Sequence, residues 1–474
     1  MKITFIRPHM TSRRAADALE PLVFGILSRL TPPDVELVLY DDRIEPIPYD
    51  EPTDLVAITV ETFTAKRAYQ ISAQYKKRGV PVVMGGYHPT LLPDEVCQYA
   101  DAVAIGDAEE LWPRIVEDAR NRRLQSRYKA SGEPVLAVLA GVNPDRKIFA
   151  NKKYRPLHLV QVGRGCKFAC DFCSIHAFYG RSMPRRCLED VMTEMDELRG
   201  KYIFFADDNL FTNIEQAEEL FKALIPYNIH WSCQVSLDIA QNPKLLDLMA
   251  QSGCTGALIG FESLNESNLV LMRKKWNLKY GDYASTLARF YERGIMVYGS
   301  FVFGYDYDTP DAFDRTLDFA LRSKLALAQF NPLIPTPSTS LYDRIKKENR
   351  LIYDKWWLDD RYRYGEMIFH PSSMTAQELA EGCFRLRSEF NSYSSIFARM
   401  LAPQMNARSV YNLFAYLAIN FISRREIFNK QSVPLGDGSP LSSLSVSFQN
   451  EVYDSNGLRM ASASTEQPVD LEIT

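Results

Sequence analysis

The sequence predicts an α/β protein with an N-terminal doubly wound, Rossmann-like domain, a partial (β/α)6 barrel and a C-terminal helical region. Three observations predict this order. Short apolar segments alternate with amphipathic segments through residues 1–120. Six further apolar segments recur between residues 158 and 333, again separated by helical patterns. Beyond about residue 350, aromatic and cationic residues replace the strand pattern. Continuous apolar segments between helices are typical of buried parallel strands.

The first predicted domain covers residues 1–145. Its candidate strands are residues 3–6, 35–40, 55–60, 82–84 and 102–105. Between the third and fourth strands, TAKRAYQISAQYKKRG predicts a helix that begins at Thr64 and ends at Gly79, because glycine is favoured just past a helix. Residues 120–155 mix charges with Pro and Gly and predict a connection. A doubly wound sheet binds ligands at the carboxyl ends of its strands.

The second predicted domain, residues 155–345, is the barrel. Its candidate strands are residues 158–162, 202–206, 231–236, 256–261, 296–304 and 327–333. Six strand–helix units predict a parallel, partly open barrel, whose chemistry collects at the carboxyl ends of the strands. The segment that follows the first strand therefore lies at the barrel mouth.

Composition excludes several classes of protein. The net charge of −4 and the lack of a basic block argue against a nucleic-acid partner. No apolar run reaches 18 residues, and the N-terminus does not resemble a signal peptide. Eight cysteines, three of them in one loop, are typical of a reducing compartment. We therefore expect a cytoplasmic protein.

The run GRGCKFACDFC places Cys166, Cys170 and Cys173 in a Cys-x3-Cys-x2-Cys spacing. Three thiolates in one loop can hold an iron–sulfur cluster. A cubane with four irons then keeps one iron open for a substrate. Two alternatives stay open at this point: a chance group of buried cysteines, or a zinc site with His176 as fourth ligand.

This motif resembles the radical S-adenosylmethionine (SAM) superfamily, and the resemblance covers about residues 158–335. It implies a single [4Fe–4S] cluster on the three cysteines, SAM on the open iron, and an electron donor of the flavodoxin or ferredoxin type that drives cleavage of SAM to a 5′-deoxyadenosyl radical. SAM-binding residues are expected at the ends of the barrel strands, at Phe172, Asp207, Asp208, Asn209, Gln234, Ser236, Glu262 and Gly304.

Some of these residues have plainer interpretations. Phe172 could simply pack in the core, and Asn209 or Thr212 could cap a helix. Glu262, a lone carboxylate after an apolar strand, could pair with a barrel arginine.

The order of domains resembles the cobalamin-dependent radical SAM class, which includes C-methylases and an anaerobic cyclase. The matching segments, residues 60–69, 85–90 and 104–110, each follow a predicted strand. The resemblance implies cobalamin contacts from Thr62, Thr64, Gly85, Gly86, His88 and Gly106. The Asp-x-His-x-x-Gly corrin motif is absent, so we expect cobalamin without a histidine on cobalt. The alternative is a domain that has kept the fold and lost the corrin.

The C-terminal helical region is predicted to cover residues 346–440. Its most apolar part, residues 411–425, predicts a core helix or a surface that meets a lipid-like substrate or a membrane. Residues 441–474 are rich in serine and are predicted to be disordered.

Together these features predict a cobalamin-dependent radical SAM enzyme, a C-methyltransferase acting on an unactivated carbon of a small or lipid-like metabolite. Cyclisation, oxidation or ring rearrangement with the same cofactors is the first alternative. A cobalamin-binding sensor or carrier, and an electron-transfer iron–sulfur protein without SAM, are alternatives from other classes.

Overall fold

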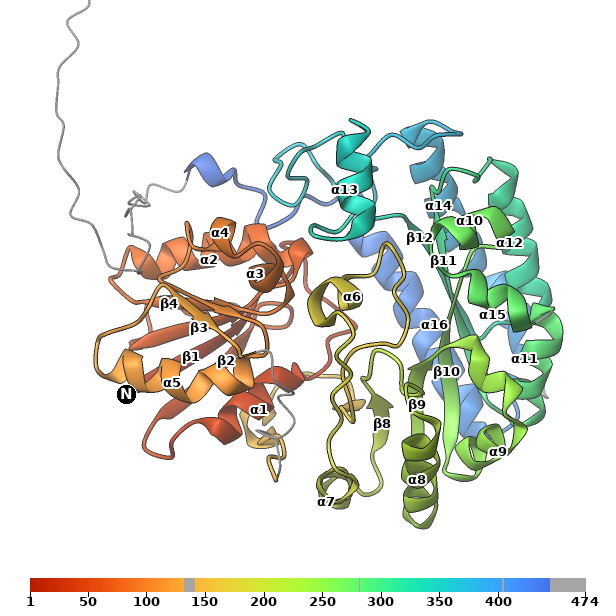
Figure 1. The fold of residues 1–474 in the computed structure, drawn as a ribbon, viewed down its shortest axis with the longest axis horizontal. Helices are drawn as coiled ribbons and strands as arrows, with labels where there is room; N and C mark the ends of the chain where they lie inside the picture. The colour runs from red at the N-terminus through yellow and green to blue at the C-terminus, as the bar shows by residue number, and fades with distance from the viewer. Residues whose placement is uncertain (132–140, 281, 403–404, 444–474) are drawn as a thin grey trace, which may run out of the picture.

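The computed structural model describes residues 1–131, 141–280, 282–402 and 405–443. Two six-stranded sheets dominate it, one in the N-terminal third of the chain and one in the middle (Figure 1). Every pairing of neighbouring strands in both sheets is parallel, which confirms the predicted α/β class.

The first sheet has the strand order β2-β1-β3-β4-β5-β6. Its strands are β1 (Lys2–Arg7), β2 (Glu36–Asp41), β3 (Leu55–Thr59), β4 (Val82–Gly85), β5 (Ala102–Ile105) and β6 (Arg127–Lys129). All five predicted strands are present. The strand β6 lies in the segment predicted to be a connection, and only its middle residue, Tyr128, is buried. The strand order reverses between β1 and β3, and such a switch point is where doubly wound sheets bind ligands.

Helices cover both faces of this sheet (Figure 1). Helices α1 (Leu22–Leu30) and α5 (Ala108–Arg120) pack with Leu55 and Ala57 of β3. The alternate residues Val56 and Ile58 pack with α2 (Ala65–Lys76) on the other face. The remaining short helices are η1 (Thr62–Thr64), α3 (Tyr87–Leu91), α4 (Pro93–Val96) and η3 (Arg146–Phe149).

The second sheet follows chain order, β7 to β12. Its strands are β7 (His158–Val160), β8 (Tyr202–Phe205), β9 (His230–Val235), β10 (Cys254–Glu262), β11 (Met296–Phe303) and β12 (Leu327–Pro332). All six coincide with predicted strands. The end strands β7 and β12 are not paired with each other in the described part of the chain, so this is an open barrel.

Helices follow the barrel strands, and most of them line the outer face of the sheet, whereas the first, Ser174–Tyr179, lies on the side toward the first sheet (Figure 1). Their bounds are α6 (Ser174–Tyr179), α7 (Leu188–Glu197), α8 (Ile214–Leu224), η4 (Ile225–Tyr227), η5 (Leu237–Gln241), α9 (Pro243–Gln251), α10 (Glu266–Leu271), η6 (Lys275–Tyr280), α11 (Tyr283–Glu292), α12 (Asp311–Arg322) and α13 (Ser340–Lys347). Cys233 and Val235 of β9 are buried toward these helices, whereas Gln234 between them is exposed. By strand alternation, Gln234 faces the hollow of the barrel.

The C-terminal region adds α14 (Ala376–Phe390), α15 (Tyr393–Met400) and α16 (Val410–Lys430). Helix α16 contains the apolar stretch 411–425, but it turns polar residues inward. Asn412 donates to Gly294 O (3.3 Å) and Asn420 donates to Ala326 O (2.9 Å), so the helix packs where β11 and β12 begin. Its apolar residues Val410, Phe414, Ile419, Phe421 and Phe428 are exposed. Within the described residues, none of the helices is long and apolar enough to cross a bilayer.

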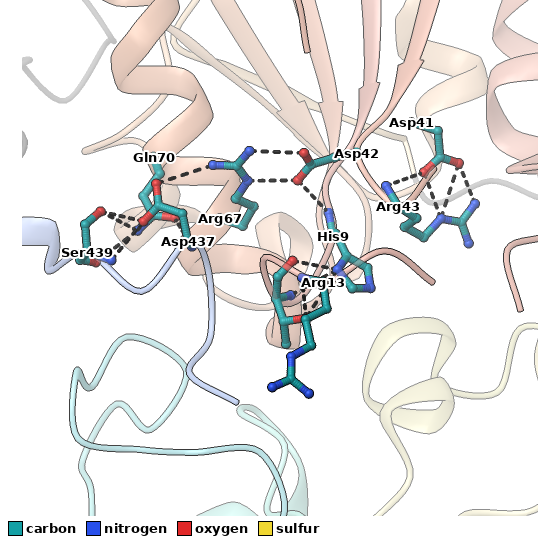
Figure 2. Close-up of polar contacts among 10 residues, drawn as sticks. His9, Arg13, Asp41, Asp42, Arg43, Arg67, Gln70, Asp437 and Ser439 are labelled. Atoms are coloured by element: carbon teal, nitrogen blue, oxygen red, sulfur yellow. Dashed lines mark hydrogen bonds and ion pairs between the residues drawn. The ribbon is translucent and has the colours of Figure 1, made fainter. Parts of the chain in front are cut away.

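After α16 the chain returns to the first domain, and we call residues 431–443 the strap. Gly436 N donates to Met10 O (2.9 Å), and Gln70 of α2 bonds with Asp437 and Ser439 (Figure 2). The strap ends in η7 (Leu441–Ser443), inside the stretch predicted to be disordered. The remainder of that stretch, residues 444–474, lies outside the described residues.

Candidate active site between the two sheets

The cysteine loop lies between β7 and α6, at the barrel mouth. Cys166, Cys170 and Cys173 are unpaired and half-buried. Cys173 directly precedes α6, and the backbone N–H groups of Ile175 and His176 lower the pKa of its thiol, although burial has the larger effect and raises it. Burial raises the pKa of the Cys170 thiol to about 12, with the Cys173 and Cys166 thiols acting in the same direction and Lys274 against it. The three thiols therefore influence one another across a common space.

The arrangement of these thiols fits a cluster and not a zinc ion. Within the described ranges, no three His, Cys, Asp or Glu side chains lie close enough together to hold one metal ion. The ligands of a cubane bind different irons, so they stand further apart than the ligands of a single ion. The imidazole of His176, the suggested fourth zinc ligand, instead has Nδ1 at 3.0 Å from Gly180 O. The residues present thus suit a cluster.

Two acids at the end of β8 hold the backbone around this loop. Asp207 accepts hydrogen bonds from Val162 N (3.0 Å) and Gly163 N, and Asp208 accepts one from Gly165 N (2.8 Å). Burial raises the pKa of Asp207 to about 7, although the two N–H groups and Arg185 oppose the shift. Both acids are thus already engaged with the protein, and their predicted contact with SAM stays a prediction.

Three more predicted residues meet beside Cys166. Asn209 Nδ2 lies 3.1 Å from Ser236 Oγ and 3.8 Å from Cys166 Sγ. Gln234 Nε2 donates to Asp208 O (3.0 Å). Helix α8 has Asn213 as its N-cap, so neither Asn209 nor Thr212 serves as the cap that was the alternative.

Glu262 at the end of β10 pairs with a lysine instead of an arginine. Its carboxylate lies 2.7 Å from Lys274 Nζ, and both side chains are buried. Glu262 has φ +63°, a left-handed conformation, at an irregularity in the pairing of β10 with β11. Strained backbone of this kind gathers at functional sites. Lys274 also lowers the pKa of Cys170, so the pair stands next to the cysteine loop. Nothing local in the sequence identified Lys274.

Phe172 and Gly304 lie on the side toward the C-terminal region. Phe172 packs edge-on against Tyr305, with ring centroids 6.4 Å apart. Gly304 has φ +111°, and a Cβ there would meet Leu379 (2.7 Å) and Phe369 (3.2 Å). Packing against the C-terminal region thus accounts for this glycine without SAM.

A cavity of about 420 Å³ lies at the carboxyl ends of β3, β4 and β5, and we call it the cleft. Gly85, Gly86 and Gly106 line it, so their predicted contact with cobalamin stays a prediction, and Arg164, Tyr179 and Asp208 of the barrel domain line the opposite side. Its volume is within the usual range for ligand sites.

The other predicted cobalamin contacts lie elsewhere. Thr62 and Thr64 do not line the cleft, and Thr64 Oγ1 accepts from Glu61 N (3.0 Å) at the start of the helix. His88 is fully buried, with Nε2 at 3.1 Å from both Tyr69 Oη and Glu95 Oε1. The histidine in GGYHPT therefore stabilises the first domain.

Arg164 joins the cysteine loop to the first domain. Its guanidinium bonds with Asp107 (2.7 Å) and with Glu109 at the start of α5, and it is buried. These acids belong to the AIGDAEE segment. The sequence analysis did not single out the arginine or the two acids. The sequence did contain a signal for this ion pair: two acids directly follow a predicted strand, and a glycine-rich loop carries an arginine.

Two further cavities continue from the cleft. The middle cavity, of about 550 Å³, shares Val23, Thr59, Glu61 and Leu159 with the cleft. The far cavity, of about 320 Å³, shares Phe63 and Tyr364 with the middle one and is lined by Phe172. Adjoining cavities thus lead from the first sheet to the aromatic residue within the cysteine loop.

Comparisons with known proteins agree with this architecture. The family model described as the radical SAM superfamily matches residues 160–320. Bacteriochlorophyllide d C-12(1)-methyltransferase of Chlorobaculum tepidum is 30% identical over 398 residues, which cover 81% of this chain and 86% of that protein.

Two solved structures share the fold. The radical SAM methyltransferase TsrM of Kitasatospora setae, with cobalamin and a [4Fe–4S] cluster bound, has a TM-score of 0.59 at 16% identity, covering 73% of this chain and 78% of that one. The cobalamin-dependent SAM radical enzyme OxsB, with aqua-cobalamin and SAM bound, has a TM-score of 0.65 at 13% identity, covering 90% and 71%.

Proposed function

The chain belongs to the cobalamin-dependent radical SAM methyltransferases, and from that premise we propose that it methylates an unactivated carbon of a small or lipid-like substrate. The observation that carries the proposal is the position of the cleft. It lies at the carboxyl ends of β3, β4 and β5, the edge at which doubly wound sheets bind ligands, and Arg164 of the cysteine loop lines it. The two cofactors of the class would then face a shared space.

When bound, the cluster with SAM supplies an organic radical and cobalamin supplies the methyl group. The residues of the chain position and shield these groups. Asp207 and Asp208 fix the backbone of the cysteine loop, and Asn209, Ser236 and Glu262 are proposed to hold SAM at the strand ends. A bound SAM ammonium would compete with Lys274 for Glu262.

Two partners belong to this proposal. An electron donor of the flavodoxin or ferredoxin type would reduce the cluster. The exposed apolar residues of α16, with Phe414 74% exposed, are proposed to touch a membrane surface that delivers a lipid-like substrate. Flotation with anionic vesicles tests this contact: a Phe414→Ser, Phe421→Ser chain that floats as the unchanged chain does would remove it.

The function is tested with the anaerobically reconstituted chain, given iron, sulfide, cobalamin and SAM with a deuterated methyl group. A bacteriochlorophyllide is the first substrate to offer. We expect 5′-deoxyadenosine and a product heavier by one deuterated methyl group. A product that has lost hydrogens and gained no methyl would instead support a cyclase or oxidase. Bound corrin with no SAM cleavage under any condition would support a sensor or carrier.

A further inference from the structure

The far cavity combines aromatic walls with one charged group. Phe63, Phe172, Tyr362 and Tyr364 line it, together with the apolar Leu333. The single charged lining residue is Arg387, from helix α14. Aromatic walls of this kind suit a flat or apolar ligand.

Arg387 is a buried cation whose charge the protein does not balance. Its side chain is 9% exposed, and its Nε donates to Cys383 O (3.2 Å) in its own helix. Its Nη2 is buried without a hydrogen-bond partner, and no carboxylate lies within ion-pair distance, among the residues that the structure describes. A buried charge without a partner is costly, so it indicates a missing anion.

Other buried arginines of this chain show the usual arrangement. Arg164 pairs with two acids. Arg399 donates to five oxygens: Ser395 Oγ, Leu325 O, Ala326 O, Phe390 O and Asn420 Oδ1. Of these three arginines, Arg387 alone both lines the far cavity and has a side-chain nitrogen without a hydrogen-bond partner among the described residues.

We propose that the far cavity binds the carboxylate of an aromatic or otherwise flat, apolar substrate, with Arg387 as its anchor. The inference rests on the proposed function and names its substrate class. A guanidinium matches a carboxylate with two parallel hydrogen bonds. Through Phe63 and Tyr364 the far cavity meets the middle cavity, which adjoins the cleft. A substrate anchored at Arg387 would therefore extend toward the place where the two cofactors meet.

SAM is the competing ligand, because it carries a carboxylate and Phe172 is predicted to contact it. The two sources differ in what Arg387 affects. If the arginine anchors the substrate, its removal weakens substrate analogues and leaves SAM binding and SAM cleavage unchanged. If the arginine anchors SAM, its removal weakens SAM binding and slows SAM cleavage.

The test uses the reconstituted holoenzyme and three probes: 2-naphthoate, the neutral 2-naphthamide and 2-naphthyl phosphate. Binding is read from tryptophan fluorescence, since Trp356 packs on Phe63 with centroids 4.7 Å apart. We expect naphthoate to bind at least about tenfold tighter than naphthamide, and Arg387→Gln to bring this ratio close to one. Arg387→Lys should retain part of the ratio, because it keeps the charge and loses the fork.

Arg385→Gln is the matched control, on the same helix but 43% exposed and paired with Asp314. It should keep the full ratio. An unchanged ratio in Arg387→Gln, tighter binding of the naphthyl phosphate than of naphthoate, or an equal loss of SAM binding would each overturn the proposal. Circular dichroism and cluster content show whether Arg387→Gln folds. If it does not, Arg387→Lys takes its place, and a naphthoate-to-naphthamide ratio equal to that of the unchanged chain would overturn the proposal. The probes report binding alone, so a chain without methylase activity can still pass or fail this test.

Discussion

Arg164 is the residue that most directly fixes the cysteine loop against the cleft. Replacing it with Met leaves the buried Glu109 and the half-buried Asp107 without a cation, and breaking a buried pair in this way costs about 3–5 kcal/mol. We therefore expect Arg164→Met to lower the thermal midpoint by several degrees. Scanning calorimetry of the reconstituted chain measures this.

The control for Arg164 is Arg322→Met, which removes an exposed pair with Asp318 and should cost about 0–1 kcal/mol. Adding Asp107→Asn and Glu109→Gln to Arg164→Met should recover part of the loss, because the buried charges are then gone. A triple variant no more stable than Arg164→Met would show that packing, and not charge, accounts for the effect.

Asp308 gives the fold a specific dependence on pH. Burial raises its pKa to about 6, although hydrogen bonds from Gly304 N (2.9 Å) and Tyr305 N (3.2 Å) oppose the shift. The folded chain therefore holds a proton on Asp308 that the unfolded chain releases between about pH 4 and 6. This contribution to stability is present at low pH and is lost as pH rises through 6.

Asp308→Asn should remove that dependence. Its stability relative to the wild type should rise by about 2 kcal/mol from pH 4.5 to pH 7, on top of any constant offset. Thermal midpoints at three pH values measure it, with the exposed Asp318→Asn as control. If the difference in thermal midpoint between Asp308→Asn and the wild type stays constant across this pH range, Asp308 remains ionised in the folded chain.

The residues whose position agrees with expectation are those whose place follows from local spacing. The cysteine loop and Gly85, Gly86 and Gly106 lie at the strand ends where they were expected. The predictions for His88 and Glu262 lacked the partners Glu95 and Lys274, because these pairs depend on the folded arrangement of distinct elements. The sequence alone does not indicate which buried charged residues will form a pair in the folded chain.

At the scale of elements, apolar continuity predicted the strands well. All eleven predicted strands are present, because parallel strands buried on both faces leave a strong signal. The strand β6 has no such signal in the sequence, because its three residues RYK have a single buried side chain at the edge of the sheet. Helix α16 inverts the usual pattern: its asparagines face inward and bond with the backbone just before β11 and β12, so apolar content alone could not orient it.

The cysteine loop depends on a close backbone crossing at Gly165. Gly165 has φ +78°, and a Cβ there would lie 2.2 Å from Ser182 O. Gly165→Ala must therefore displace the backbone that carries Cys166. We expect several-fold less iron and sulfide after anaerobic reconstitution.

Gly180 provides the matched control for Gly165. It also has a positive φ, +59°, but nothing lies within 4 Å of its missing Cβ. Gly180→Ala then costs only backbone strain, about 1–3 kcal/mol, and should keep its cluster. Equal loss of cluster in the two variants would mean that backbone strain, and not the crossing with Ser182, limits this loop.

At the scale of the whole molecule, the C-terminal region holds the two sheets in one unit. Lys66 pairs with Asp360 (2.6 Å), and Trp357 Nε1 donates to Glu95 (2.9 Å). The strap adds a third link through Gln70 (Figure 2). The partners in these links are 262 to 367 residues apart in the chain, and the VPLGDGSP stretch of the strap has the composition of a loop. No local pattern could have predicted that it fastens the first domain.

The link between Gln70 and Asp437 is open to a double-mutant cycle. Gln70 is buried, its Nε2 donates to Asp437 Oδ1 (2.8 Å), and its Oε1 accepts from Asp437 N (3.0 Å). Gln70→Ala loses both bonds and also its bond to Ser439 O (3.0 Å), whereas Asp437→Ala loses only the first. We expect each to cost about 1–2 kcal/mol and the pair to be less than additive by about 0.5–1 kcal/mol, with Asp50→Ala, whose side chain is 97% exposed, as a neutral control. Hydrogen exchange gives the sharper measurement. The backbone amide of residue 437 should exchange faster in Gln70→Ala than in Asp437→Ala, because its acceptor, Gln70 Oε1, is present only in the second variant. Equal exchange in the two variants would mean that the strap is held by the burial of Val433 and Leu435, and that Gln70 contributes no more than packing.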